Sequence, residues 1–172
     1  MITPDWVRMM AAYNAWMNRR LYAQLSELPD EERKAERGAF FGSIHGTLNH
    51  LLFGDQAWMA RFGVGSPPNG RIGDILYDGF GELCAAREAM DERILAWADG
   101  VDSAWLATPL AYRSAVDGQT RRLPVWVLVS HLFNHQTHHR GQLTTLMSQI
   151  GLDPGVTDLP WLPGLAEAAG PA

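Results

Sequence analysis

One stretch decides the fold: Pro124 to Gly151, PVWVLVSHLFNHQTHHRGQLTTLMSQIG. A proline at the first turn and a glycine just past the end are typical of one long helix. Apolar residues recur at every third or fourth position from Leu128 onwards, so they form a stripe on one face of this helix. His135 and His139 occupy positions inside that stripe. Because burying a bare polar group costs several kcal/mol, these two imidazoles need a partner.

Three earlier segments show the same helical spacing of apolar residues. The first begins at the capping residue Thr3 and stops before Pro29, the second runs from Ser43 to about Phe62, and the third covers roughly residues 79–98. Residues 104–123 lose the helical pattern and contain an Asp-Gly turn, which predicts a short hairpin or extended crossover before the last helix. We therefore expect an all-α fold, a four-helix bundle, in a single domain over residues 1–172.

Composition excludes several classes of protein. The net charge of −5 and the lack of a basic cluster argue against nucleic-acid binding. No apolar run reaches the roughly 18 residues of a membrane span, and the start of the chain does not resemble a signal peptide. The single cysteine, Cys84, excludes an internal disulfide and suits a reducing compartment. The sequence thus predicts a cytoplasmic protein with no nucleic-acid or membrane partner.

A histidine pair four residues apart on one helical face can supply two ligands to a single metal ion. Four of the six histidines fall between His131 and His139, but His131 and His138 lie towards the polar side of the helix. A solvated helix edge or hydrogen-bonded core histidines would be the alternative for the cluster. Two imidazoles within an apolar stripe favour metal binding over that alternative.

The third ligand should come from another helix, where the chain offers His45 and His50. Gly46 and Gly54 lie one turn to either side of His50 and would let another helix approach closely. His50 is off the main apolar stripe of its helix, so periodicity does not select it over His45.

Gln136 excludes one well-known class of metal enzyme. With glutamate at this position, residues 135–139 would read H-E-x-x-H, the metalloprotease helix in which glutamate is the general base. Glutamine cannot accept a proton at neutral pH, so a protease of that type is not expected.

Four motifs spread over nearly the whole chain belong together: YNAWMN at residues 13–18, SIHGTLNHLL at 43–52 with Asp55 and Trp58, HLFNHQTHHRGQ at 131–142, and GVTDLP at 155–160. The histidine run of the last helix is the most specific of them. Through these motifs the chain resembles the DinB (damage-inducible) superfamily and its YfiT-like metal-dependent enzymes.

This resemblance implies an up-down-down-up bundle with a three-histidine metal site, whose ligands here would be His50, His135 and His139. Related proteins include thiol-dependent enzymes, namely mycothiol-dependent maleylpyruvate isomerase and bacillithiol S-transferases. The family resemblance also implies a homodimer. One face of the second helix looks wider than a single bundle seam needs, which adds to that expectation: Ile44, Leu48, Leu52, Met59 and Phe62.

We therefore expect a metal-dependent enzyme, a transferase or a hydrolase, with a thiol S-transferase acting on small electrophilic substrates as the specific hypothesis. Its cofactor would be a divalent transition metal, with zinc and nickel as the leading candidates. Its partners would be a small-molecule substrate and a low-molecular-weight thiol. The alternative is a non-catalytic metal-binding protein of the stress or damage response. A solvent-connected pocket at the histidines would favour the enzyme, and a sealed site the alternative.

Asp55 is an acid on the apolar stripe of the second helix. It is expected either to orient a ligand histidine or to form a structural ion pair with Arg140 or Arg61, and the ion pair is favoured.

Overall fold

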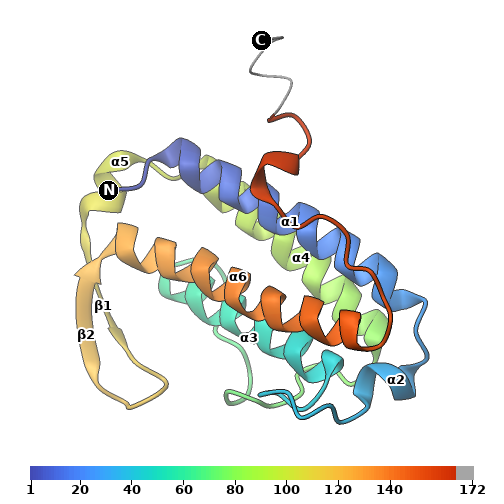
Figure 1. The fold of residues 1–172 in the computed structure, drawn as a ribbon. Coiled ribbons are helices and arrows are strands. Elements are labelled where there is room, and N and C mark those ends of the chain that lie inside the picture. Colours follow the sequence, from blue (N-terminus) through green and yellow to red (C-terminus); the bar gives the residue numbers. More distant parts are fainter. Residues whose placement is uncertain (166–172) are drawn as a thin grey trace.

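The computed structural model describes residues 1–165 and is mostly helical (Figure 1). Four helices are long, and each matches a segment expected from the sequence. Two short helices, a two-stranded sheet and a 3-10 turn complete the fold. The elements are α1 (Pro4–Ser26), α2 (Asp30–Lys34), α3 (Ile44–Arg61), α4 (Phe80–Asp99), α5 (Ser103–Ala107), β1 (Pro109–Arg113), β2 (Thr120–Pro124), α6 (Val125–Gln149) and the 3-10 turn η1 (Leu159–Trp161).

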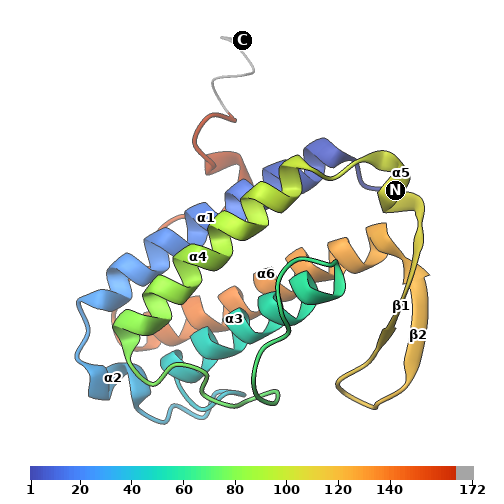
Figure 2. The ribbon, with the colours of Figure 1, turned by 180° about the vertical axis from the view of Figure 1, so that it is seen from behind.

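The four long helices pack side by side around one core. Helix α1 lies along α4, α3 lies along α6, and further contacts join α3 to α4 and α1 to α6. Followed along the colour scale of Figure 1, α1 and α6 run one way and α3 and α4 run the other. Seen from behind, the long connection between α3 and α4 crosses over α3 (Figure 2).

Two helix starts expected from the sequence are confirmed by their caps. The Thr3 hydroxyl accepts a hydrogen bond from the backbone N–H of Trp6 (3.2 Å), and the Ser43 hydroxyl accepts one from Gly46 (3.0 Å). Each hydroxyl satisfies a backbone N–H that has no partner within the helix. The second cap fixes where α3, the helix that carries His50, begins.

The expected hairpin is present, and it corrects the all-α class. Strands β1 and β2 are antiparallel, from the pair Pro109–Pro124 to the pair Arg113–Thr120. Gly118 in the connecting turn has φ of 69°, a conformation that side chains with a Cβ rarely adopt. The fold is therefore mostly helical with a small sheet. The short helices α2 and α5 were not expected.

The face of α3 that suggested a dimer is buried within the chain itself. Ile44, Leu48, Leu52 and Met59 are fully buried in the core between the long helices, and Phe62 is half-buried against the same core. This face is therefore not available to a second copy, and the homodimer remains a prediction from the family resemblance. No helix within residues 1–165 combines the length and the apolar character that crossing a membrane requires.

Candidate metal centre

Three histidines from two helices bring their Nε2 atoms together. His50 Nε2, on α3, lies 3.2 Å from His135 Nε2 and 3.2 Å from His139 Nε2, both on α6. The three possible ligand atoms all lie within 4.8 Å of one another. The pair on α6 is one helical turn apart, so both rings project from the same face towards α3. The structure thus brings together the three histidines expected as ligands.

The spacing of these nitrogens fits a metal ion. With Zn–N bonds of about 2.0–2.1 Å and tetrahedral angles, two ligand nitrogens lie about 3.3 Å apart, close to the two separations of 3.2 Å measured from His50 Nε2. A neutral imidazole nitrogen is either a donor or an acceptor. His50 Nε2 faces two other ring nitrogens and cannot form a good hydrogen bond to both of them, since it carries either one proton or one lone pair. A cation shared by the three nitrogens would satisfy all of them.

Burial keeps these imidazoles in the protonation state that metal binding needs. Burial, together with the nearby charge of His139, lowers the pKa of His135 to about 3 and that of His50 to about 4. Burial also lowers the pKa of His139, although its hydrogen bond to Gln142 opposes the shift. All three rings are therefore neutral at physiological pH, with nitrogen lone pairs available as ligands.

Neighbouring side chains orient the rings. The Nδ1 atom of His139 donates to Gln142 Oε1 (2.7 Å), which leaves the Nε2 lone pair free to face the site. Phe41 stacks on His50 with ring centroids 3.7 Å apart and an angle of 17° between the planes. The second nitrogens of His50 and His135 are buried and have no partner within the described residues.

Two glycines of α3 permit this close packing. A Cβ at Gly54 would lie 2.7 Å from the His135 ring, and a Cβ at Gly46 would lie 2.1 Å from the backbone oxygen of Phe41. Such distances are shorter than van der Waals contact. The glycines one turn to either side of His50 therefore admit a ligand ring on one side and the segment that covers His50 on the other.

The other histidines have different roles. His45, the alternative third ligand, is buried away from the cluster and donates from Nε2 to the backbone oxygen of Tyr77 (2.8 Å), so it anchors the connection between α3 and α4. His131 lies against Trp58, with ring centroids 4.9 Å apart. His138 is exposed, as its place on the polar side predicted.

Asp55 does not pair as expected. Its carboxylate accepts from Arg87 Nη1 (2.6 Å) and from Gln136 Nε2 (2.8 Å), and none of its hydrogen bonds within residues 1–165 involves a histidine. The prediction of Arg140 or Arg61 as its partner is wrong. The prediction that Asp55 forms a structural ion pair is confirmed, with Arg87 as the partner. The sequence did contain a signal for the true partner, because Arg87 lies in the apolar stripe of α4 and Asp55 in that of α3. A cation and an acid that are both expected to be buried indicate an ion pair.

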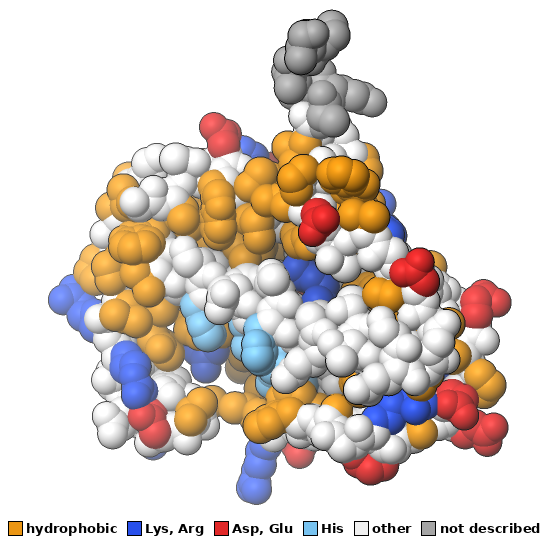
Figure 3. Space-filling model, viewed as in Figure 1, with side chains coloured by type: hydrophobic (Ala, Val, Ile, Leu, Met, Phe, Trp, Pro, Cys, Tyr) orange, Lys and Arg blue, Asp and Glu red, His pale blue; other side chains and the backbone are white. Residues whose placement is uncertain are grey.

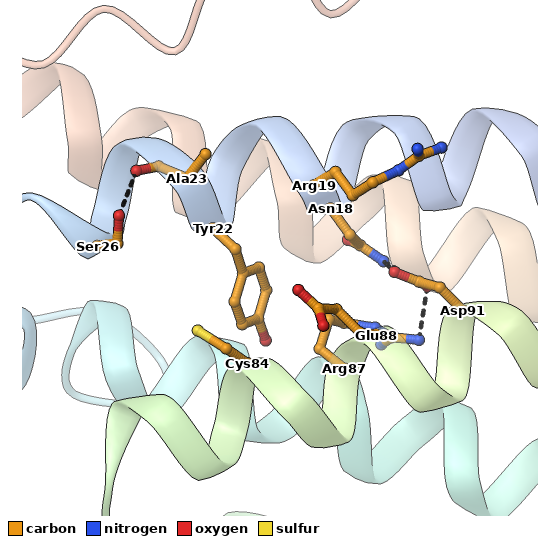
Figure 4. Close-up of a pocket in the computed structure, with 9 residues that line it drawn as sticks. All are labelled: Asn18, Arg19, Tyr22, Ala23, Ser26, Cys84, Arg87, Glu88 and Asp91. Atoms are coloured by element: carbon orange, nitrogen blue, oxygen red, sulfur yellow. Dashed lines mark hydrogen bonds and ion pairs between the residues drawn. The ribbon is translucent and has the colours of Figure 1, made fainter.

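The ion pair continues into a network that reaches α1. Arg87 Nη2 lies 2.9 Å from Asp91 Oδ1, and this carboxylate also accepts from Asn18 (2.9 Å) and Asn14 (3.2 Å). Figure 4 shows Asn18, Arg87 and Asp91 meeting beside a cavity of about 240 Å³ between α1 and α4. Asn14 accepts in turn from Arg140 on α6.

The network therefore passes through all four long helices and returns to α6. Its two ends on α6, Gln136 and Arg140, directly follow the clustered histidines His135 and His139 in the sequence. Two carboxylates and two guanidinium groups take part, so their formal charges cancel. The histidine turns of α6 are thus held on their inner side by a neutral, buried polar network.

The histidines form the floor of a pocket of about 440 Å³. Figure 3 shows imidazoles in a hollow on the face that carries α3 and α6, bordered by hydrophobic side chains. Phe41, Phe53 and Trp58 line its walls, and the described residues that line it include no aspartate or glutamate. At its mouth, three exposed apolar side chains come from three separate connections: Phe40, Ile72 and Val116.

Fold and site together define a mostly helical protein with a three-histidine cluster open to a pocket. The chain belongs to the DinB family, whose model matches residues 1–170. It is 27% identical over 163 residues to Protein DinB of Bacillus subtilis (strain 168), covering 90% of this chain and 91% of that protein. A crystal structure of a DinB-like protein from Bacillus cereus ATCC 10987 is similar in fold. It shows a TM-score of 0.61 and 21% identity, over 81% of this chain and 90% of that one.

Proposed function

We propose that this chain is a metal-dependent enzyme, a thiol S-transferase, built on an up-down-down-up four-helix bundle. His50, His135 and His139 would hold a divalent transition metal, with zinc or nickel as the leading candidates. The proposal rests on one observation: three neutral ring nitrogens converge at the floor of an open pocket.

Three protein ligands leave a position for a further ligand, as in catalytic rather than structural zinc sites. When bound, the metal would lower the pKa of a thiol and so supply a thiolate at neutral pH. The sulfur would then bond to an electrophilic carbon of the substrate, whose leaving group departs with the bonding electron pair, while the thiol proton passes to solvent.

The chain's own residues would prepare this reaction. Gln142 holds the His139 ring, and Phe41 covers one face of His50 and excludes water from it. The apolar walls would accept the carbon skeleton of an electrophile. The absence of acids among the described lining residues also favours the approach of a thiolate.

Metal analysis of protein purified without a histidine tag tests the site. His50→Ala, His135→Ala and His139→Ala should each lose stoichiometric metal, because each removes one of three protein ligands. His45→Ala and His138→Ala are the matched controls and should keep it. Equal metal content in all five variants and the wild type would refute the site.

The reaction needs its own test. Cobalt-loaded protein titrated with 2-mercaptoethanol should gain a sulfur-to-cobalt charge-transfer absorption. The loaded protein should also accelerate substitution of the chlorine of 1-chloro-2,4-dinitrobenzene by the thiol, with release of chloride. Metal binding with neither effect would favour the alternative, a non-catalytic metal-binding protein of the stress or damage response. The open pocket supports the enzyme over that alternative.

A further inference from the structure

The pocket above the histidines contains one permanent cation that no acid neutralises. Arg61, the last residue of α3, lines this pocket and is partly exposed. None of the ion pairs formed within residues 1–165 includes it. Arginine stays charged at any physiological pH, so the guanidinium presents an unpaired positive charge to whatever enters the pocket.

Aromatic rings hold this guanidinium in place. Its central carbon lies 4.6 Å from the ring centroid of Trp58 and 5.6 Å from that of Tyr112. These contacts use the faces of the rings, and no hydrogen bond within the described residues uses the N–H groups of Arg61. The planar fork that matches a carboxylate is therefore fixed in position and free to donate.

Arg61 lies where two cavities meet. A second cavity of about 420 Å³ continues to Pro67 and Pro68. It shares four lining residues with the histidine pocket: Phe53, Ala57, Arg61 and Ala115. Its described lining residues also include no acid. Together the two cavities form a groove with apolar walls. The histidines line the first cavity, and the guanidinium of Arg61 lies where the two cavities adjoin. An apolar ligand with one anionic group matches that distribution.

Helix geometry sets the length of such a ligand. Arg61 follows His50 by eleven residues on the same helix, which places their backbones roughly 16 Å apart along the axis. The Arg61 side chain folds back over Trp58, one turn earlier, which shortens this separation. An anionic group on the guanidinium and a reactive group at the histidines would therefore be roughly 10 Å apart.

We propose that Arg61 determines specificity by binding the carboxylate of an apolar ligand whose other end lies at the histidines. Only the assignment of the reactive end rests on the function proposed above. The carboxylate can belong to the thiol or to the electrophile, since both must reach the same groove. The chemistry that Arg61 recognises is the same in either case.

Calorimetric titration of the metal-loaded protein tests this with two matched pairs of probes. One pair is 6-mercaptohexanoate and its amide, and the other is 4-phenylbutanoate and its amide. The wild type should bind at least one acid about tenfold or more tightly than its amide. Arg61→Gln should remove this preference and leave amide binding unchanged, while Arg61→Lys should keep part of it. Arg93→Gln, which removes an exposed arginine of α4, should keep all of it.

The two acids separate the two sources of the carboxylate. A preference confined to the mercapto acid assigns the carboxylate to the thiol, and a preference for the phenyl acid assigns it to the electrophile. Acids and amides that bind equally, or a preference that survives Arg61→Gln, would overturn the inference.

Metal content measured on the same samples separates this inference from the proposed function. If the protein does not retain metal, the same titrations are made without it, and an Arg61-dependent preference would then support the anion site while the proposed function fails. Full metal content in Arg61→Gln, together with an unchanged preference for the acid, would leave the function standing and remove the anion site.

Discussion

Replacing Arg87 by methionine should destabilise the protein strongly, because it leaves two buried carboxylates without their shared cation. Arg87 is 2% exposed, and Asp55 and Asp91 are 0% and 6% exposed. Breaking a buried ion pair by removing one partner costs about 3–5 kcal/mol. Domains of this kind have a total stability of about 5–15 kcal/mol, so the loss is a large part of the total. For a chain of this size it corresponds to a fall in Tm of roughly 6–20 °C.

A second substitution tests whether the network is the cause. Asp55→Asn should cost about 1–3 kcal/mol by itself. Combined with Arg87→Met, it removes one of the two uncompensated carboxylates, so the double variant should be more stable than Arg87→Met by about 1–3 kcal/mol.

The measurement is equilibrium unfolding in urea at pH 7, followed by tryptophan fluorescence on protein freed of metal with a chelator. Arg121→Met is the matched control, since Arg121 lies 2.6 Å from Asp117 in an exposed pair, and its urea midpoint should hardly change. If the losses of the two single variants simply add in the double variant, the two residues do not interact and the network has no such role.

Three further predictions concern the glycines, His45 and the oligomer. Gly54→Ala should lower metal affinity by displacing the His135 ring. The control Gly141→Ala, with open space around it, should keep metal and stabilise α6 by about 0.5–1 kcal/mol. Equal metal affinity in both variants would contradict the close-packing role of Gly54. His45→Phe should lower the free energy of unfolding by about 0.5–1.5 kcal/mol, with metal content unchanged, because the Tyr77 carbonyl loses one donor and keeps the other, Asn49. Loss of metal would show that His45 belongs to the site. Light scattering should report a dimer of twice 19.1 kDa, and a species of 19.1 kDa at micromolar concentration would exclude it.

Much of the fold could be predicted because the long helices carry strong local signals. The caps Thr3 and Ser43 and the proline before α6 mark where helices begin, and apolar spacing shows how far they continue. The five-residue helices α2 and α5 could not be predicted in this way, since a single turn is too short to show a period of 3.6 residues.

The site was only partly predictable, because it depends on how helices are rotated against one another. His135 and His139 could be recognised from the stripe of α6 alone. His50 could not be separated from His45 by spacing, since both are buried and only the packing of α3 on α6 decides which ring meets the pair. The partner of Asp55 depended in the same way on α4, so the choice of Arg140 or Arg61 was wrong.

The mouth of the pocket is built by parts of the chain that carry no metal ligand. Phe40, Ile72 and Val116 belong to three different connections, and each is exposed. Substitutions or insertions there would reshape the entrance without disturbing the core or the histidines, because surface loops tolerate change far better than packed helices. Close relatives could therefore diverge in the molecules they admit while keeping the same histidine cluster. Exchanging these three connections between them would be a direct way to change which molecules enter the pocket.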